Sequence, residues 1–581
     1  MKKNLFFLFV AILAVACAPR LRDGEYTLTV LSTNDMHGTF FDSTYTGGGI
    51  KRSVFAMNHY IDSVRADQGK DNVLLVDAGD CLQGDDATYY FNFVDTVTTH
   101  VFSRIVDYMD YDAVAVGNHD IETGHQVYDR VAEDLRKADA PFLAGNAIRN
   151  SDGKPYFPLY KVVRKAGLKI AILGYTNANI KAWLPEELWS GMHFVAIKEI
   201  VQADVDAVKA KEHPDVMVVT MHSACGKGDG TILEAEALDA FNSVQGVDFL
   251  VCGHDHRPYV ETRDSSALLN SGSHSRYVAE GKMHYKVEGG KIVSRSYETQ
   301  LIRVKAEMAD PAMRELFYDD YLAVKAFTLA EVGTLDQTVY TRDAFAGMSY
   351  YIGLMHTLSL EATGADIAFA APLTYNKVIE AGPIIFDDLF TFYPFENQLY
   401  VITMTGEEIL RYLEFSYDMW INTVKSSKEH VLKIQHRDDP RTQQRGWSFP
   451  GRTYNFSSAG GINYTVDVTK PCGERVKISS MADGSAFDLT RTYNVAVTSY
   501  RASGGGGHLQ AAGIDTGNIN DRVVGRYPEI RTILYNYLKE NGSIERARIC
   551  NPAVIGSWSF VPESIAAPAI DQDMKLVFGE K

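Results

Sequence analysis

The sequence predicts an α/β fold, and three observations lead to this prediction. Short runs of Val, Ile and Leu recur between residues 25 and 305, and turn-forming or polar residues close them. Amphipathic stretches such as 51–68 and 197–211 lie between these runs and have helical character. The chain has 581 residues, which is too long for one hydrophobic core, so we expect two domains.

The first 17 residues have the pattern of a signal peptide. Met1-Lys2-Lys3 precedes an apolar stretch from Leu5 to Val15, which is shorter than the ~20 residues that a helix needs to cross a bilayer. Residues 13–17, Leu-Ala-Val-Ala-Cys, resemble a lipobox with Ala14 in place of the usual Leu. We expect an exported bacterial lipoprotein, cleaved before Cys17, anchored by lipid on Cys17, and periplasmic or at the cell surface. A plain signal or short anchor with an incidental cysteine is the alternative.

Six apolar runs account for the expected strands of the first domain, residues 25–305: 28–34, 73–79, 113–117, 169–174, 216–221 and 249–253. Runs that are apolar on both faces are typical of strands in a sheet that is covered on both sides. Residues 306–330 are rich in Ala, Glu, Lys and Leu, and we expect a helical connector there. A second strand-and-helix region, 331–555, would form the second domain, and 556–581 a tail with scattered Pro and Ala.

The composition is that of a globular protein, with 46% apolar and 23% charged residues. The net charge of −17 argues against binding of nucleic-acid polymers, which depends on Lys and Arg meeting phosphates. Small phosphate-bearing molecules are not excluded, because bound divalent cations would dominate the local field of a site.

Residues that bind metals follow five of the six apolar runs, and only the run before Tyr175-Thr176 lacks a strong ligand. The carboxyl ends of strands are where such sheets bind ligands, so we expect these side chains to converge on one crevice. Mixed carboxylate, amide and imidazole ligands favour Zn, Mn, Fe or Co over Mg or Ca. The candidate ligands of two divalent metal ions are Asp35, His37, Asp80, Asn118, His222, His254 and His256.

Two further residues are candidates for catalysis. His119 follows the ligand Asn118 and would face the leaving group of a substrate, with Asp120 orienting the imidazole. Other residues of the same types have plainer explanations: His100 and His125 as hydrogen-bonded core or surface residues, and Asp77 as a carboxylate that caps a turn.

The ordered motifs Asp-x-His, Gly-Asp, Gly-Asn-His-Asp, His and Gly-His-x-His resemble those of the calcineurin-like metallophosphoesterases. With the two-domain length, the resemblance narrows to the bacterial 5′-nucleotidase and 2′,3′-cyclic-nucleotide 2′-phosphodiesterase family, over most of residues 26–550. It implies an αββα sandwich as the first domain, an α+β substrate-binding domain after it, and a substrate cleft between the two. It also implies one ion at Asp35, His37, Asp80 and His256, another at Asp80, Asn118, His222 and His254, and His119 with Asp120 as the catalytic pair.

The second domain contains two aromatic and glycine-rich segments, 454–467 and 498–507. Glycine lets a backbone approach a ligand closely, and aromatic faces stack on a nucleobase with ~1–3 kcal/mol per base. We therefore predict Phe456 and Tyr500 as a nucleobase clamp and Arg501 as a contact to phosphate or ribose. The alternatives are core aromatics and a solvated arginine.

One departure from the family's pattern bears on the substrate. Typical 5′-nucleotidases carry Asn-x-Gly-Gly-x-Arg in the second domain, whereas the corresponding stretch here, 370–376, is Ala-Ala-Pro-Leu-Thr-Tyr-Asn, without Arg. This favours the cyclic-phosphodiesterase and 3′-nucleotidase branch.

We thus predict a metal-dependent phosphoric ester hydrolase that cleaves extracellular 2′,3′-cyclic and 3′-nucleotides by metal-hydroxide attack. A 5′-nucleotidase or UDP-sugar hydrolase is the main alternative, and a thiosulfate-ester hydrolase or a non-catalytic nucleotide-binding surface protein is more distant. The expected partners are nucleotide substrates and, through the lipid alone, a membrane. We expect no obligate protein partner.

Overall fold

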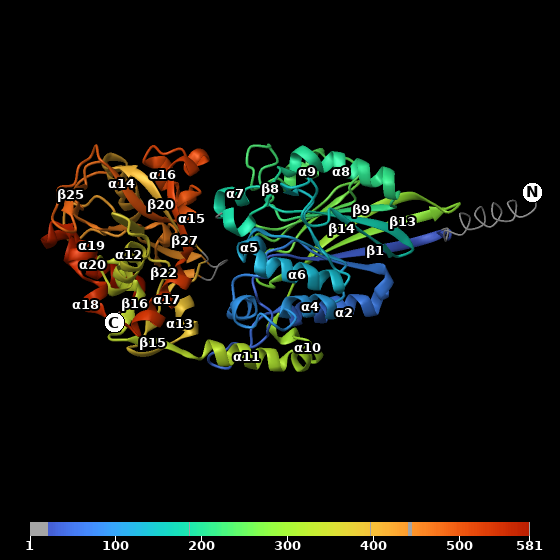
Figure 1. Cartoon of the computed structure of the whole chain (residues 1–581), viewed down its shortest axis with the longest axis horizontal. Coiled ribbons are helices and arrows are strands. Elements are labelled where there is room, and N and C mark those ends of the chain that lie inside the picture. Colours follow the sequence, from blue (N-terminus) through green and yellow to red (C-terminus); the bar gives the residue numbers. More distant parts are fainter. Residues whose placement is uncertain (1–20, 185, 396, 440–443, 580–581) are drawn as a thin grey trace, which may run out of the picture. The chain divides into compact units, whose positions relative to one another are not determined.

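The computed structural model describes residues 21–184, 186–395, 397–439 and 444–579. The chain divides into two compact units, the first ending at Lys325 and the second beginning at Ala326 (Figure 1). The predicted signal peptide and Cys17 lie outside the described residues. Among the residues that are described, no helix is both long and apolar enough to cross a membrane.

Two six-stranded sheets form the framework of the first unit. The first sheet has the order β14 (Lys291–Arg303), β13 (Tyr277–Glu288), β1 (Gly24–Thr33), β2 (Val73–Asp77), β3 (Ala113–Ala115) and β4 (Phe142–Leu143). The second has the order β11 (Tyr259–Thr262), β12 (Ala267–Asn270), β10 (Phe249–Cys252), β9 (Val216–Met221), β7 (Leu168–Tyr175) and β6 (Tyr160–Lys165). In both sheets the central strands are parallel, so their carboxyl ends lie at one edge.

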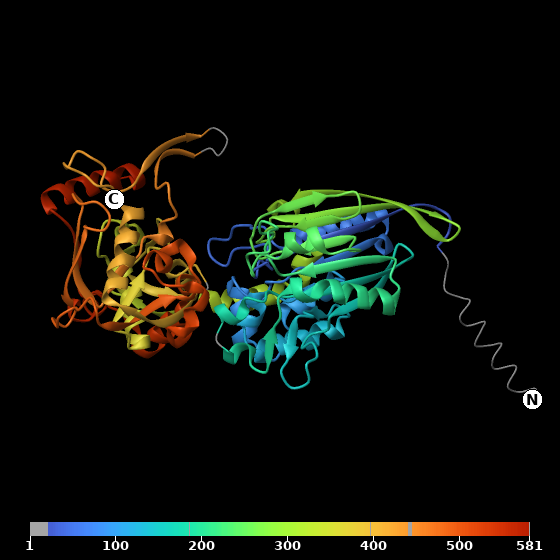
Figure 2. The same cartoon turned by 90° about the horizontal axis from the view of Figure 1, so that it is seen from above.

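The two sheets pack face to face, and helices cover their outer faces. Val30 and Leu74 of the first sheet share one buried cluster with Ile172 and Val218 of the second. The next residue along β1, Leu31, points the other way, because successive strand side chains alternate between faces. That outer face packs on α2 (Val54–Gln68), α4 (Val101–Tyr108) and α6 (His125–Lys137), and the second sheet packs on α8 (Ile197–Glu212) and α9 (Ala237–Ser243). The predicted αββα sandwich is confirmed, and Figure 2 shows its layers.

The segment expected as a connector packs against the first unit. It contains α10 (Pro311–Leu316) and α11 (Tyr318–Thr328), and the boundary between the units falls inside α11. Met313 and Phe317 are buried in the core under α2, and Arg104 of α4 donates to Asp320 at 2.7 Å. Residues 306–325, which are most of the expected connector, are therefore part of the first unit and not a free linker.

The second unit is built around a mixed five-stranded sheet with the order β23 (Ser458–Gly460), β17 (Ile367–Ala370), β26 (Thr492–Thr498), β20 (Gln398–Thr405) and β27 (Val523–Glu529). Strands β17 and β26 are parallel, and β20 is antiparallel to both of its neighbours. Helices α12 (Tyr350–Thr363) and α14 (Gly406–Trp420) pack beside this sheet. The arrangement is the α+β domain that was predicted.

The last residues of the chain differ from the predicted tail. Residues 558–561 form β29 (Trp558–Val561), which pairs in parallel with β24 (Ile462–Asp467), and α20 (Glu563–Phe578) follows. Ala566, Ala569 and Ile570 of α20 are buried in the core of the second unit. Scattered Pro and Ala obscure this helix in the sequence, since Pro568 lies inside it and small residues give weak periodicity.

Candidate active site

The candidate metal ligands occupy turns that follow the carboxyl ends of neighbouring strands. Asp35 and His37 follow β1, Asp80 follows β2, Asn118 begins α5 (Asn118–Glu122) after β3, His222 follows β9, and His254 and His256 follow β10. Several of these turns hold non-glycine residues in the left-handed region, with φ of 49° at Asp35, 46° at His37, 61° at Asp80, 78° at His254 and 58° at His256. Such conformations cost of order 1–3 kcal/mol each and persist where function constrains the backbone.

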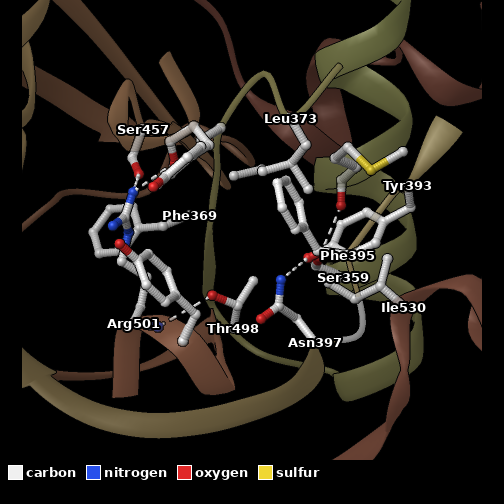
Figure 3. Close-up of a pocket in the computed structure, with 15 residues that line it drawn as sticks. Ser359, Phe369, Leu373, Tyr393, Phe395, Asn397, Ser457, Thr498, Arg501 and Ile530 are labelled. Atoms are coloured by element: carbon white, nitrogen blue, oxygen red, sulfur yellow. Dashed lines mark hydrogen bonds between the residues drawn. The ribbon is translucent and has the colours of Figure 1, made fainter. Parts of the chain in front are cut away.

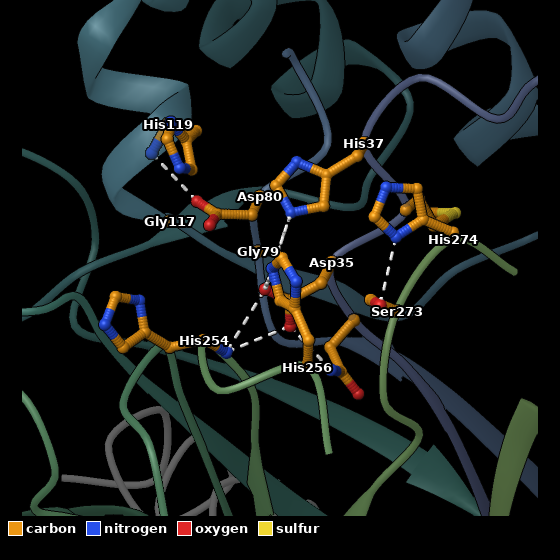
Figure 4. A network of polar contacts seen from close by, with 12 residues as sticks. Asp35, His37, Gly79, Asp80, Gly117, His119, His254, His256, Ser273 and His274 are labelled. Atoms are coloured by element: carbon orange, nitrogen blue, oxygen red, sulfur yellow. Dashed lines mark hydrogen bonds and ion pairs between the residues drawn. The ribbon is translucent and has the colours of Figure 1, made fainter. Parts of the chain in front are cut away.

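The structure brings six of the seven candidate ligands into two clusters (Figure 4). Asp35, His37 and His256 form the first cluster, and Asp80, His222 and His254 form the second, with ligand atoms within 4.8 Å of one another in each. In the first, Nε2 of His37 lies 2.9 Å from Nε2 of His256. In the second, Nε2 of His222 lies 3.0 Å from Oδ2 of Asp80. Each cluster therefore directs nitrogen and oxygen ligands toward a common point.

A buried polar atom supports occupation of these clusters by cations. The seventh candidate, Asn118, has its Oδ1 buried without a hydrogen-bond partner. Buried polar atoms are nearly always paired in native proteins, so an orphaned amide oxygen next to these ligands indicates a bound ion. The residues present therefore fit two divalent cations.

At three of the ligands the electrostatics favour the protonation states that bind metals, whereas at His222 the Asp80 carboxylate outweighs burial and raises the pKa to about 10, so a cation there would displace a proton. Burial would raise the pKa of Asp80, but the imidazoles of His222 and His119 outweigh it and hold the pKa well below its ordinary value. Burial lowers the pKa of His37 and of His254 to about 3, which leaves both imidazoles neutral. An ionised carboxylate and neutral imidazoles are the forms that coordinate a metal.

His119 lies at the site, but Asp120 does not orient it. The Asp120 carboxylate is fully buried and accepts from the backbone N–H groups of Gly117, Asp80, Cys81 and Leu82 at 2.8–3.0 Å. Its role is to tie the Asp80 turn to the start of α5. The predicted pairing of Asp120 with His119 is therefore wrong.

Glu122 is the carboxylate that contacts His119, and sequence reasoning missed it. Its Oε2 lies 2.5 Å from Nδ1 of His119. Burial lowers the pKa of His119, but Asp80 and Glu122 outweigh it and raise the pKa to about 9. The spacing from His119 to Glu122 is i to i+3 on a helix, and this signal was available because such residues are neighbours on a helix face.

Close backbone packing explains why glycines precede two of these residues. A Cβ at Gly117 would collide with the Asp80 carboxylate, and a Cβ at Gly79 would lie 2.6 Å from the backbone nitrogen of Gly117. Gly79 also has φ of 94°, in the left-handed region. In the same turn the Asp77 carboxylate accepts from Gly79 N at 2.7 Å. Asp77 therefore caps the turn, as predicted from the sequence.

The second unit contains a pocket of about 180 Å³ (Figure 3). Its walls are largely aromatic and apolar, with polar groups from Asn397, Thr498 and Arg501. Tyr500 is 37% exposed and lines the pocket beside Tyr454, with ring centroids 6.0 Å apart. Phe395 also lines the pocket, and its ring centroid lies 5.8 Å from that of Tyr454.

Two predictions for this region need correction. Phe456 is 1% exposed and stacks on Trp420 at 5.6 Å in the hydrophobic core, so its ring is not available as a clamp face. Tyr454, two residues earlier in η6 (Thr453–Asn455), takes the place in the pocket wall. Arg501 is 4% exposed and donates to Asn455 Oδ1 and to the backbone oxygens of Gly505 and Tyr454 at 2.9–3.0 Å. Arg501 is thus not solvated, and its guanidinium is not free to donate hydrogen bonds to a substrate phosphate. It holds the two aromatic segments together.

Comparisons with known proteins agree with this architecture. The family model of the calcineurin-like phosphoesterases matches residues 28–258, and that of the 5′-nucleotidase C-terminal domain matches residues 331–513. The chain is 24% identical to a 2′,3′-cyclic-nucleotide 2′-phosphodiesterase/3′-nucleotidase of Haemophilus influenzae, over 93% of this chain and 88% of that protein. It is 22% identical to a trifunctional nucleotide phosphoesterase of Bacillus subtilis over 92% of this chain, which spans only 39% of that longer protein.

A solved structure shares the fold of both units. A Staphylococcus aureus protein, assigned as a 5′-nucleotidase and solved in complex with α-ketoglutarate, matches with a TM-score of 0.69 and 21% identity. The match covers 92% of this chain and 99% of that one.

Proposed function

The chain joins a calcineurin-like phosphoesterase domain to a 5′-nucleotidase C-terminal domain and is a metal-dependent phosphoester hydrolase, and on this premise we propose that it hydrolyses 2′,3′-cyclic and 3′-nucleotides. The observation that carries the hydrolytic part is the pair of adjacent ligand clusters around Asp35 and Asp80. Relatives with nucleotide substrates in their names, such as the Haemophilus influenzae protein, support the substrate class.

The residues of the first unit divide into metal-holding and proton-handling groups. Asp35, His37 and His256 would hold one cation, and Asp80, Asn118, His222 and His254 the other, with Asp80 as the shared carboxylate. When bound, such a pair of cations supplies an acidified water and positive charge for the phosphoryl oxygens. The mixed nitrogen and oxygen ligands favour Zn, Mn, Fe or Co.

His119 serves the leaving oxygen in this proposal. Glu122 holds its Nδ1 at 2.5 Å, which fixes the ring and leaves Nε2 to stabilise or protonate the departing ribose oxygen. The backbone N–H of His119 donates to Asp80 Oδ1 at 2.8 Å, so the same short helix positions both residues. Asp120 acts indirectly, because its four hydrogen bonds to backbone N–H groups fix that helix to the Asp80 turn.

The aromatic pocket of the second unit would receive the nucleobase. Stacking on Tyr500 or Tyr454 contributes ~1–3 kcal/mol per base and tolerates any base. The pocket volume of about 180 Å³ suits a flat heterocycle, and Asn397 offers an amide that can pair with a base edge. The stretch 370–376 lines part of this pocket with Ala370, Ala371 and Leu373 and contains no arginine, which favours cyclic and 3′-substrates over 5′-monophosphates.

A second candidate activity is 5′-nucleotide hydrolysis. The match of residues 331–513 to the 5′-nucleotidase C-terminal domain favours it, as does the likeness to the Staphylococcus aureus structure. The setting proposed for either activity is the cell exterior, on a lipid anchor at Cys17, with scavenging of nucleosides and phosphate as the role. Export and anchoring rest on the sequence pattern of residues 1–17.

Phosphate release from 2′,3′-cyclic AMP, 3′-AMP and 5′-AMP tests the proposal, with Mn²⁺ and with EDTA. The cyclic assay includes an added monoesterase, so that ring opening is detected. Metal-dependent release led by the cyclic and 3′-substrates is the expected result. Release led by 5′-AMP would replace the proposal with the second candidate, and no release from any of the three would refute both candidate activities.

A further inference from the structure

His274 lies beside the first ligand cluster but does not belong to it. Its ring centroid is 5.1 Å from that of His37 and 5.8 Å from that of His256. Among the described residues, the first cluster consists of Asp35, His37 and His256, and His274 is not one of its members. The His274 side chain is exposed to solvent, whereas His37 and Asp35 are buried. It therefore stands on the side of the cluster from which a substrate can approach.

His274 and Ser275 hold strained backbone conformations that residues other than glycine rarely adopt. The residues 273–276 form a turn in which Arg276 N donates to Ser273 O at 3.3 Å, with φ of 54° at His274 and 52° at Ser275. A turn with positive φ at both central positions normally takes Asn-Gly or Gly-Gly. A histidine and a serine at these positions cost stability that glycine would avoid, and such strain collects at functional sites.

Neighbouring residues fix this turn against the first cluster. His274 N donates to the backbone oxygen of Asp35 at 2.8 Å, and the Asn34 side chain donates to Gly272 O at 2.6 Å. Since Asn34 directly precedes the ligand Asp35, the His274 turn and the first cluster form one rigid assembly. The backbone that carries the imidazole is thus held against the first cluster by contacts within the protein.

The contact with Ser273 favours one tautomer of the His274 ring. Arg276 Nη2 donates to Ser273 Oγ at 2.7 Å, and Ser273 Oγ lies 3.0 Å from His274 Nδ1. Within the described part of the chain, Nδ1 is the acceptor within reach of the Ser273 hydroxyl proton. With Nδ1 accepting this proton, the neutral ring carries its own hydrogen on Nε2.

We propose that His274 is a specificity residue whose Nε2–H donates to an unesterified phosphoryl oxygen of the substrate. His119 and His274 flank the His37 ring, at 5.5 Å and 5.1 Å, on opposite sides in Figure 4. His119 serves the leaving oxygen, and His274 serves the phosphoryl group from the other side. Two unesterified oxygens would face the ligand clusters, and only a phosphomonoester has a third for His274, so among the proposed substrates the contact favours 3′-monoesters over cyclic diesters. The inference rests on hydrolysis at the two clusters and not on the nucleoside part of the substrate.

The test compares 4-nitrophenyl phosphate with bis(4-nitrophenyl) phosphate, using the full-length, metal-loaded protein. In His274→Gly, kcat/KM for the monoester is expected to fall about ten- to a hundred-fold, the usual effect of losing a hydrogen bond to a charged group. For the diester it is expected to fall less than about three-fold. The dissociation constant of inorganic phosphate, measured by calorimetry, is expected to rise as the monoester rate falls. His274→Gln, which places an amide N–H near the former Nε2, is expected to recover part of the loss.

Structural effects are separated by stability and metal content. Because glycine tolerates φ of 54°, the melting temperature of His274→Gly is expected to equal or exceed that of the wild type. Two controls are expected to keep wild-type selectivity: Ser275→Gly, which relaxes the same turn, and His59→Ala, which removes an exposed imidazole of α2.

Three results would overturn the proposal: an unchanged monoester-to-diester ratio, unchanged phosphate binding, or loss of one metal equivalent from His274→Gly, which would make His274 a ligand. If the wild-type protein cleaves the nitrophenyl esters but no nucleotide, the proposed function is refuted. The inference about His274 is then still decided by the comparison of the two nitrophenyl esters.

Discussion

Asp80 carries the strongest expectation at the scale of single residues, because it is the carboxylate that both cations would share. Asp80→Ala is expected to lower turnover by about a thousand-fold or more, since a metal pair contributes several kcal/mol to transition-state stabilisation. Metal analysis of the purified variant is expected to show fewer than two ions per chain. Near-normal turnover in correctly folded Asp80→Ala would contradict the shared role.

Glu122 is expected to act only through His119. In Glu122→Gln the imidazole loses its charged partner at Nδ1, and kcat is expected to fall about ten- to a hundred-fold, within the range of general acid–base effects. Metal content is expected to stay at the wild-type value. Glu133→Gln on α6 is the matched control, because Glu133 is paired with Arg136 at the surface away from the ligands. Equal losses in both variants would remove Glu122 from the mechanism.

Substitutions of Phe456 and Tyr454 are expected to affect different properties: stability in the case of Phe456 and substrate binding in the case of Tyr454. Phe456→Ala removes a buried ring that stacks on Trp420 and is expected to lower the free energy of unfolding by about 3–5 kcal/mol. Tyr454→Ala opens the pocket wall and is expected to raise KM for nucleotides about ten-fold with a smaller effect on unfolding. Denaturant unfolding and steady-state kinetics of both variants give the comparison. The reverse pattern would restore Phe456 as the clamp residue.

Residues whose type and place in a motif are both distinctive could be identified from the sequence. Residues whose role depends on a rotamer or on burial could not. Asp35, His37, Asp80, His222, His254 and His256 could be selected because each follows an apolar run, and the structure places them in the two clusters. Nothing in the segment 454–456 shows that Tyr454 faces the pocket and Phe456 the core, because both orientations follow from the short 3₁₀ turn η6, which contains Tyr454 and ends just before Phe456. Glu122 is an intermediate case: its i to i+3 spacing from His119 was available in the sequence, but the rotamers of α5 decide that Glu122 and not Asp120 contacts the imidazole.

At the scale of elements, patterns that burial enforces were predictable and those set by long-range pairing were not. The strands β2, β7, β9 and β10 are buried along nearly their whole length, so their apolar runs are unbroken and easily recognised. By contrast β29 is four residues long and is held by pairing with β24, about 90 residues earlier in the chain. A short strand of this kind has no periodicity of its own to reveal it.

Helix α12 makes the second unit sensitive to acid through His356. This imidazole is fully buried, lies 3.1 Å from Ser458 Oγ, and has its pKa lowered by burial to about 3. The unfolded chain therefore binds one more proton at this site than the native chain between pH about 3 and 6.5. The contribution of this site to the free energy of unfolding is expected to be fully present above pH 6.5. At pH 5 it is expected to be smaller by up to about 2 kcal/mol.

His356→Gln tests this expectation, because glutamine has no proton to gain. Urea unfolding at pH 7.5 and pH 5 is expected to show a smaller pH-dependent loss for the variant than for the wild type, whatever their difference at pH 7.5. His436→Gln, at an exposed position of the hairpin strand β21 (Gln435–Asp439), is the control and is expected to keep the wild-type slope. A slope for His356→Gln equal to that of the wild type would contradict the assignment.

At the scale of the whole molecule, the two units are expected to respond differently to loss of metal. Both ligand clusters lie in the first unit, on turns whose left-handed residues carry strain. A ligand that binds only the folded state stabilises it by about 2.7 kcal/mol at a hundred times its dissociation constant. EDTA is therefore expected to lower the unfolding temperature of the first unit and to leave that of the second unchanged.

Calorimetry of the intact chain with and without EDTA measures this, and limited proteolysis near the lower transition assigns it to a unit. Added Zn²⁺ or Mn²⁺ is expected to restore the first transition. Asp80→Ala is expected to unfold like the EDTA-treated wild type and to show little further change with EDTA, which separates loss of the site from nonspecific chelator effects. A single transition that shifts as a whole would mean that the units unfold together, and a shift confined to the second unit would place the essential metal elsewhere in the chain.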